Sequence, residues 1–247
     1  MATNLKMKRG WMAALIVTAI LLIDQIIKIL VKTNMALHEQ IEIFSWFKIV
    51  FIENNGMAYG MEIGSKLILS IFRIIAVAIL GWYIVRQVKK NARWGYIACL
   101  SMVMAGAAGN IFDSMFYGLI FNASSNYYVS YFVPFGTGYA PFLMGKVVDM
   151  FYFPLIVTTW PEWIPRVGGN PFVFFSPVFN FADAAISVGA VLLLLFYRKE
   201  IGEIEFRRSK LKLAQRGMRS KKREYETYNS HNSASVSYVL LQTHSTG

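Results

Sequence analysis

The four aspartates of this sequence carry its most informative chemistry, because they lie in or beside long apolar stretches. They are Asp24, Asp113, Asp149 and Asp183. A charged carboxylate at the centre of a membrane helix costs about 2.5–3.5 kcal/mol, so such residues tend to face a protein interior and to mark function. When two carboxyl groups lie close together, one keeps its proton and the other acts as a base. Such a pair can polarise a carbonyl and activate water, which is the chemistry of amide hydrolysis.

Asp149 and Asp183 are the best candidates for such a pair. Asp149 lies in a long loop, within Val147-Val148-Asp149-Met150, and Asp183 lies near the start of the last apolar stretch. Both are therefore expected near the same face of a membrane. The spacing alone does not bring them together, so a structural role as a helix cap or loop charge stays open for each.

The composition indicates a membrane protein. Hydrophobic residues make up 55% of the chain and charged residues 16%, against about 45–50% and about 25% in an average soluble domain. The aromatic content of 15% excludes a disordered chain. The single cysteine, Cys99, excludes an intramolecular disulfide, and the three scattered histidines form no convincing metal centre.

Four apolar stretches are candidates for the helices that position the aspartates. A membrane-spanning helix needs roughly 20 mostly apolar residues, and runs of this kind favour a helical bundle over strands. We expect spans at about residues 11–31, 67–85, 95–112 and 177–197, with a continuation of the third to Phe121 left open. The predicted fold is an all-α membrane protein with four transmembrane helices and two outward loops. The second loop could contain short strands at the membrane surface.

Basic residues indicate the orientation of these spans. They gather before the first span, in the link between the second and third, and in the tail from Arg198 onward, which holds 11 Lys and Arg. The two long loops carry few basic residues, namely Lys32, Lys48, Lys146 and Arg166. By the positive-inside rule, both termini are expected in the cytoplasm and both long loops outside.

This orientation divides the chain into three parts. Residues 1–10 are expected to be a cytoplasmic segment, residues 11–197 a single membrane domain, and residues 198–247 a basic cytoplasmic tail that is partly disordered. The net charge of +11 then comes mostly from the basic residues that set the topology and from a tail expected near anionic lipid. Nucleic-acid binding is therefore not expected.

Five short blocks follow one another along the chain. They are Asp24-x-x-x-Lys28, Asn54-Asn55-Gly56-Met57-Ala58-Tyr59, Ala105-Gly106-Ala107-Ala108-Gly109-Asn110-Ile111-Phe112-Asp113, Val147-Val148-Asp149 and Phe179-Asn180-Phe181-Ala182-Asp183. In this order, and with four spans of this orientation, the chain resembles the lipoprotein signal peptidases, the signal peptidase II family of bacterial membrane aspartyl endopeptidases. The resemblance covers residues 24–189.

The resemblance implies roles for single residues. Asp149 and Asp183 would form the catalytic dyad. Six further residues would support the dyad or bind substrate, namely Asn54, Gly56, Asn110, Asn180, Asp24 and Asp113. Two departures stand out: Ser114 follows Asp113 where family members often carry Arg, and the segment 121–145 is longer than in compact members.

The activity implied by the resemblance is removal of the signal peptide from a prolipoprotein, by cleavage just before a Cys that carries a diacylglyceryl group. Two carboxyl groups and water suffice for this reaction, so no metal ion or organic cofactor is expected. The implied partners are prolipoprotein signal peptides, membrane lipid and peptide antibiotics such as globomycin. We expect a monomer in the bacterial inner membrane, with its active site toward the outer face.

Two other classes of function stay open. Intramembrane carboxylates also serve as proton relays in small proton-coupled transporters, but these carry their carboxylates near the bilayer midplane and show an internal repeat. The best aspartate pair here lies near one face, and no repeat is evident. A non-enzymatic membrane scaffold is the third class. The intact Asp149 and Asp183 argue against it, whereas Ser114 leaves it open.

Three further features have structural interpretations. Asp24 is expected to form a buried ion pair or a hydrogen bond to a neighbouring helix. Glu53, beside Asn54, is expected to be a solvated loop charge. The Gly and Ala residues of segment 105–109 predict a face at which helices approach closely.

Overall fold

Four helices form the apolar part of the protein in the computed structural model, which describes residues 2–55 and 63–202. Their bounds are Ala2–Asn34 for α1, Ile63–Lys89 for α2, Trp94–Ile120 for α3 and Phe181–Phe196 for α4. Among the described residues, α1, α2 and α3 are long and apolar enough to cross a membrane, whereas α4 has only 16 residues. Gly56 and residues 203–247 of the predicted tail lie outside the described residues.

The helices differ from the predicted spans mainly at their ends. The first three predicted spans lie inside α1, α2 and α3, and each helix continues beyond its apolar stretch. The predicted fourth span begins too early, because Val178–Phe179 forms a short strand, β6. Asn180 then caps α4, since its side-chain Oδ1 accepts a hydrogen bond from the Asp183 backbone N at 2.9 Å. Asn is a favoured N-cap residue, so this position determines where the helix begins.

An antiparallel sheet accompanies the helices, so the all-α prediction is incomplete. Its strands, in spatial order, are β1 (Gln40–Phe44), β2 (Phe47–Asn54), β3 (Val147–Tyr152) and β6. Two further strands, β4 (Ile156–Thr159) and β5 (Pro171–Phe174), form a separate hairpin. The sequence did not predict β1 and β2 in the first loop. In β2 the β-branched and aromatic residues that favour strands form a run too short for a membrane span.

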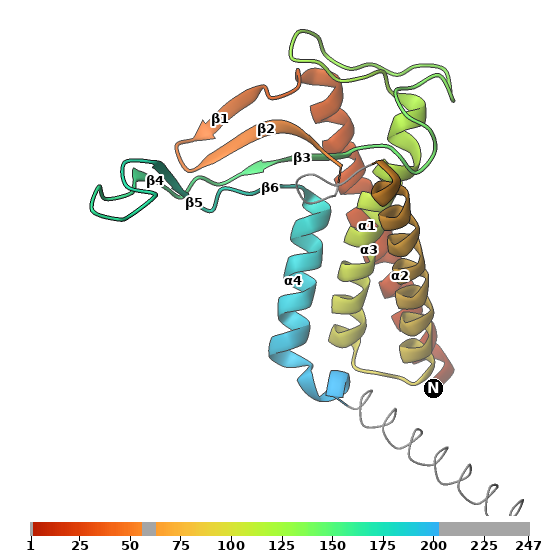
Figure 1. Cartoon of the computed structure of the whole chain (residues 1–247). Coiled ribbons are helices and arrows are strands. Elements are labelled where there is room, and N and C mark those ends of the chain that lie inside the picture. Colours follow the sequence, from red (N-terminus) through yellow and green to blue (C-terminus); the bar gives the residue numbers. More distant parts are fainter. Residues whose placement is uncertain (1, 56–62, 203–247) are drawn as a thin grey trace, which may run out of the picture. The chain divides into compact units, whose positions relative to one another are not determined.

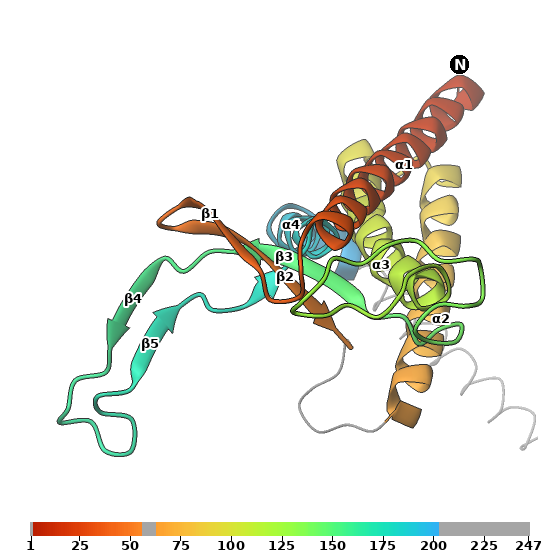
Figure 2. The ribbon, with the colours of Figure 1, turned by 90° about the horizontal axis from the view of Figure 1, so that it is seen from above.

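The sheet lies across one end of the helices, where α1 and α3 end and α4 begins (Figure 1). Seen along the helices, the hairpin of β1 and β2 and the hairpin of β4 and β5 extend to one side (Figure 2). A buried apolar cluster joins the sheet to the helices and contains Val31, Met35, Phe51, Tyr117, Phe121, Val148 and Met150. Two of these residues flank Asp149 in β3, so the cluster holds that residue against the ends of α1 and α3.

Glycines let α3 approach both α1 and α4. A Cβ atom on Gly106 would lie 2.2 Å from the carbonyl oxygen of Ala182, and one on Gly109 would lie 2.7 Å from Oδ2 of Asp24. No real Cβ fits at such distances. The prediction that this small-residue segment packs closely against other helices is therefore confirmed at these two positions.

Gly106→Ala is expected to destabilise the protein by about 1–3 kcal/mol, because the added methyl group forces α3 and α4 apart. Gly10→Ala in α1 is a matched control, since its Cβ would meet its nearest neighbour, Val88 Cγ1, at 3.9 Å. Thermal unfolding in detergent measures both variants. A Gly106→Ala protein as stable as the Gly10→Ala protein would contradict the close packing of α3 on α4.

Candidate active site

Asp149 lies in β3 and is almost completely buried, with 3% of its surface exposed. Its Oδ1 accepts a hydrogen bond from Asn180 Nδ2 at 2.7 Å, and its Oδ2 accepts one from Asn54 Nδ2 at 3.3 Å. Asn54 is the last residue of β2, the strand that pairs with β3. Each oxygen of this carboxyl group therefore has its own amide donor.

Asp183 lies in the first turn of α4, where the helix dipole favours a negative charge. Its Oδ1 accepts a hydrogen bond from Asn110 Nδ2 at 2.7 Å, and its Oδ2 accepts a longer one from the backbone N of Asn180 at 3.4 Å. Asn110 comes from the middle of α3. The second carboxyl group is thus held between α3 and the beginning of α4.

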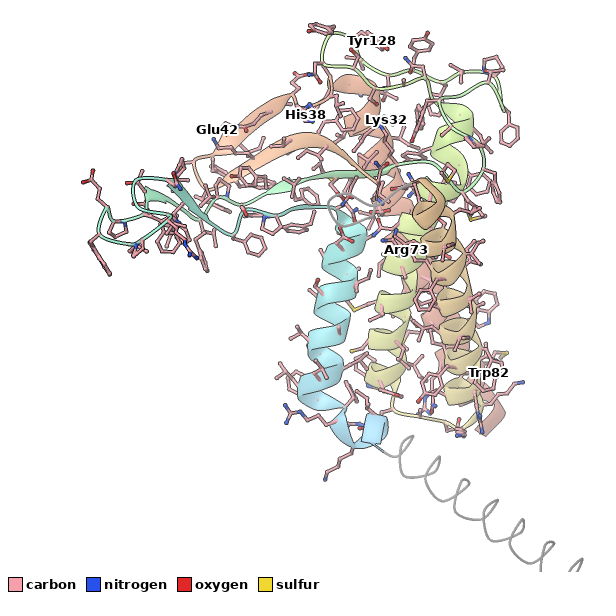
Figure 3. The ribbon with its side chains drawn as sticks, in the orientation of Figure 1. Lys32, His38, Glu42, Arg73, Trp82 and Tyr128 are labelled. Atoms are coloured by element: carbon pink, nitrogen blue, oxygen red, sulfur yellow. The ribbon has the colours of Figure 1, made fainter. Side chains whose placement is uncertain are left out.

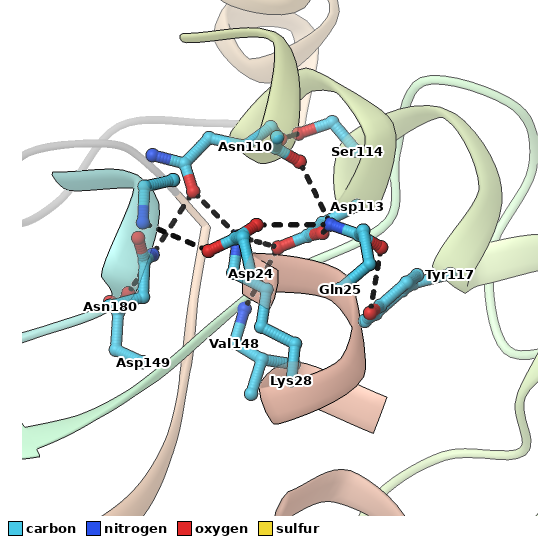
Figure 4. Close-up of polar contacts among 12 residues, drawn as sticks. Asp24, Gln25, Lys28, Asn110, Asp113, Ser114, Tyr117, Val148, Asp149 and Asn180 are labelled. Atoms are coloured by element: carbon cyan, nitrogen blue, oxygen red, sulfur yellow. Dashed lines mark hydrogen bonds and ion pairs between the residues drawn. The ribbon is translucent and has the colours of Figure 1, made fainter. Parts of the chain in front are cut away.

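Asn180 contacts both carboxyl groups, because its side chain donates to Asp149 while its backbone donates to Asp183. The same Nδ2 group also lies 3.0 Å from Oδ1 of Asn110 (Figure 4). The two asparagines therefore link the carboxyl groups through a continuous chain of amides. The structure brings together five of the predicted site residues, namely Asp149, Asp183, Asn54, Asn110 and Asn180.

Asp24 and Asp113 lie behind this chain and pair with one lysine. Lys28 Nζ lies 2.9 Å from Oδ2 of Asp24 and 2.8 Å from Oδ2 of Asp113, and none of the three residues is exposed (Figure 4). Asp24 also accepts a hydrogen bond from the backbone N of Ala182 at 2.9 Å, and Asp113 accepts one from the backbone N of Val148 at 3.4 Å. These two aspartates thus hold the elements that carry the first pair.

Asp113 has partners although Ser114 replaces the arginine of the family pattern. Beside Lys28, Gln25 Nε2 donates to Oδ1 of Asp113 at 2.8 Å. Tyr117 in turn donates its hydroxyl to Oε1 of Gln25 at 3.1 Å. Gln25 and Tyr117 were not predicted from the sequence. The signal that could have indicated Gln25 is its place directly after an aspartate inside an apolar span.

Burial and the negative charge of Asp183 raise the pKa of Asp149 to about 7. The amides of Asn180 and Asn54 and the charge of Lys28 act in the opposite direction and are outweighed. Asp149 therefore still holds its proton in part at neutral pH. This pair of carboxyl groups can supply an acid and a base at the same time.

Glu53 is buried, so the prediction of a solvated loop charge was wrong. Its side chain is 2% exposed, and the Nζ atoms of Lys32 and Lys146 lie 2.5 Å and 3.0 Å from its two oxygens. Burial opposes its ionisation, but the two lysines and Ser124 outweigh this effect and hold the pKa of Glu53 below its ordinary value. Both lysines are distant in sequence, so no local pattern could reveal the cluster.

The chemistry that this site offers is acid–base catalysis by carboxyl groups. A protonated carboxyl group can polarise a carbonyl while an ionised one takes a proton from water. In the part of the chain that the structure describes, no group of three or more His, Cys, Asp or Glu side chains could hold a metal ion.

The apolar helices and the amide-linked carboxyl pair at one end define a membrane protein with a site suited to hydrolysis. Residues 16–198 match the model of the family described as Signal peptidase (SPase) II. The chain belongs to this family and is therefore a membrane protease.

Relatives with known names support this assignment. A protein named lipoprotein signal peptidase from Porphyromonas gingivalis is 46% identical over 197 residues, which cover 79% of this chain and 87% of that one. Another of the same name, from Amoebophilus asiaticus, is 35% identical and aligns with 78% of this chain and 80% of its own length. A solved bacterial membrane enzyme has a TM-score of 0.51 at 22% identity, covering 74% of this chain and 90% of that one, and shows a similar fold.

Asp149→Asn is expected to be more favourable for stability at pH 8 than near pH 4. A carboxyl group whose pKa is raised by folding disfavours the folded state once pH rises above its unfolded value near 3.8, and the loss is complete above about 7. Asn carries no charge at any of these pH values, and the hydrogen bond that its Nδ2 cannot accept is lost equally at each pH. The gain at pH 8 has an upper limit on the order of 4 kcal/mol. Thermal unfolding between pH 4 and 8 measures it, and a pH-independent difference would contradict the raised pKa.

Proposed function

We propose that Asp149 and Asp183 are the catalytic dyad with which this protein removes the signal peptide from prolipoproteins, by cutting just before a diacylglyceryl-modified Cys. Membership of the signal peptidase II family supports the reaction. The observation that carries the dyad is the position of Asn180, which contacts both carboxyl groups. Two carboxyl groups on different elements, β3 and α4, are thereby held by one residue, as joint action on a peptide bond requires.

In the proposed mechanism, Asp149 holds the shared proton and Asp183 is the base. Asp183 takes a proton from water, whose oxygen attacks the carbonyl carbon of the scissile bond, while Asp149 gives its proton to the carbonyl oxygen. When the tetrahedral intermediate collapses, Asp183 passes its proton to the leaving amine and Asp149 recovers one from the hydroxyl group. The dyad then has its starting protonation. The raised pKa of Asp149 supports this division of roles, although the pair titrates as a unit.

Asn54, Asn110 and Asn180 would support the dyad in this mechanism. All three direct amide N–H groups at its carboxyl oxygens. Such donors stabilise negative charge, so Asn54 and Asn180 keep the raised pKa of Asp149 from rising further. Asp24 and Asp113 would act indirectly, by holding α4 and β3. Gly56 is proposed as a supporting or substrate-contacting residue from the family resemblance alone.

The same proposal includes a four-span topology, with α4 as the fourth span and residues 11–197 as the peptidase domain. Arg86, Lys89, Lys90 and Arg93 lie in or near the link between α2 and α3, at the end of the helices opposite the sheet (Figure 1). By the positive-inside rule that end faces the cytoplasm. The N-terminal segment 1–10 and the tail 198–247 would then be cytoplasmic, and the dyad would face the outer side of the inner membrane.

The proposed partners follow from this reaction. They are the signal peptide of a lipid-modified prolipoprotein, the surrounding membrane lipid and peptide antibiotics of the globomycin type. Both the signal peptide and the lipid on Cys lie in the bilayer, so a site at the outer ends of the helices reaches the bond without extracting it. We propose a monomer that needs neither a metal ion nor an organic cofactor.

Asp149→Asn and Asp183→Asn are each expected to lower the cleavage rate about 10²–10⁴-fold, because each removes one proton-transfer group of the dyad. The assay uses purified protein in detergent and a diacylglyceryl-modified prolipoprotein. Glu42→Gln is a matched control, since Glu42 is an exposed carboxylate of β1 that pairs with Lys48. Full cleavage by either dyad variant would remove the corresponding aspartate from the mechanism.

The rate constant kcat/KM is expected to fall as pH rises above about 7, roughly tenfold per pH unit. Above this pH, Asp149 loses the proton that the mechanism requires. The measurement is kcat/KM for the wild-type protein between pH 5 and 9, with thermal unfolding at each pH as a control for folding. A profile that is flat or rises through this range would contradict an acid role for Asp149.

A further inference from the structure

A second buried ionic cluster lies beside the proposed dyad and has no part in the mechanism above. Its centre is Glu53 of β2, and each of its two carboxylate oxygens forms an ion pair with one lysine. Lys32 Nζ, from the end of α1, lies 2.5 Å from Oε1, and Lys146 Nζ lies 3.0 Å from Oε2. Lys32 has no exposed surface, and the Glu53 side chain has 2%.

The long segment 121–145 covers this cluster. Ser124 Oγ lies 2.8 Å from both Oε1 of Glu53 and Nζ of Lys32. Aromatic rings surround the same ammonium group, and three of them have their centroids within 5.7 Å of it, namely those of Phe51, Phe121 and Tyr139. A buried ion pair offsets its desolvation only when its remaining donors and acceptors are satisfied. The segment supplies these partners.

The cluster spans β2 and β3 next to the proposed active-site residues. Glu53 pairs with Val148 in the ladder and is followed directly by Asn54, while Lys146 directly precedes β3. The register of this ladder shifts between Ile49 and Ile52. At such an irregularity the ladder of backbone hydrogen bonds is locally disrupted. A side-chain clamp between Glu53 and Lys146 acts at the next residues along the strands.

We propose that Glu53 is a positioning residue: clamped by Lys32 and Lys146, it keeps the amide of Asn54 within hydrogen-bond reach of Asp149. The Asn54 contact is long, at 3.3 Å, so a small slip of β2 against β3 breaks it. The segment 121–145 thereby acquires a role, since it encloses the clamp. The proposal rests on the proposed dyad only for its catalytic consequence.

The direction in which the pKa of Asp149 changes distinguishes positioning of Asn54 by Glu53 from a direct effect of the Glu53 charge. Losing the Asn54 donor raises the pKa of Asp149, because that hydrogen bond favours the ionised form. Removing the negative charge of Glu53 acts on Asp149 in the opposite direction. Other charged groups around these residues stay unchanged in the comparison, and they include Asp183 of α4, Lys28 and Asp24 of α1, Asp113 of α3, and Lys66 and Arg73 of α2.

The test compares Glu53→Gln, Asn54→Ala and the double variant. The control is Glu42→Gln, which breaks an exposed ion pair of the same sheet; Figure 3 shows Glu42 on β1 and Lys32 at the end of α1. We expect Glu53→Gln to lower kcat/KM about tenfold and to move the alkaline limb of its pH profile upward by up to about one pH unit. Asn54→Ala should lower kcat/KM and move the alkaline limb in the same way. The kcat/KM of the double variant should be no lower than that of Asn54→Ala alone.

A second readout needs no activity. The thermal midpoint of each protein is compared with that of the same protein carrying Asp149→Asn, across pH 4 to 9. The difference begins near the unfolded pKa and stops growing near the folded pKa, so the pH at which it levels off reports the ionisation of Asp149 in the folded state, and Glu53→Gln should raise that pH. If the proposed dyad is wrong, Asp149→Asn still cleaves substrate, yet this midpoint comparison continues to test the positioning of Asn54.

Three results would overturn the proposal. One is a Glu53→Gln protein that is less stable but keeps the wild-type pH profile. Another is a downward shift of the alkaline limb, and the third is a double variant whose losses simply add. Lys146→Met serves where Glu53→Gln does not fold, because the Lys146 side chain is 37% exposed and its removal leaves the Lys32–Glu53 pair. It should shift the profile upward by a smaller amount, and an unchanged profile would count against the clamp.

Discussion

The ammonium group of Lys28 is the contact on which the arrangement of the site depends. It lies between the carboxylates of Asp24 and Asp113, and all three residues are withdrawn from solvent. Without the lysine, two buried carboxylates would face each other unpaired, at a cost of several kcal/mol. Each of these carboxylates also accepts a backbone N–H, from Ala182 at the start of α4 and from Val148 in β3. One buried charge therefore joins α1 and α3 to the two elements that carry the proposed dyad.

Lys28 also determines the orientation of an amide in the site. Its ammonium donates to Oδ1 of Asn110 at 2.8 Å, and Asn180 donates to the same oxygen. Because an ammonium group offers only donors, the Nδ2 end of Asn110 must point the other way, toward Asp183. The lysine thus orients Asn110 in the same sense as Asn180, which donates to Oδ1 of Asn110, and Asp183, which accepts from its Nδ2. Replacing this lysine would remove one donor from Oδ1 of Asn110 and would unpair the aspartates.

The sequence predicts the helices and the members of the site better than it predicts their contacts. Hydrophobic length is a local property, so α1, α2 and α3 are visible in the chain, and short motifs identify Asn110 and Asn180. The sheet depends on pairing between β2 and β3, which are distant in sequence, so it was only partly expected. Glu53 was misread for the same reason, because its lysines come from α1 and from the residue before β3.

If α4 is the fourth span, as proposed, its shortness links the site to the thickness of the bilayer. A helix of 16 residues rises about 24 Å, whereas the hydrocarbon core of a typical bilayer is about 30 Å thick. In the proposed orientation, this mismatch is accommodated by local thinning of the lipid or by flanking residues that reach the interface. Asp183 lies in the first turn of this helix, so in the proposed topology its depth follows from the helix length rather than from the substrate. Membrane thickness then becomes a variable of the enzyme, and thicker bilayers place the same scissile bond at a different level from the dyad.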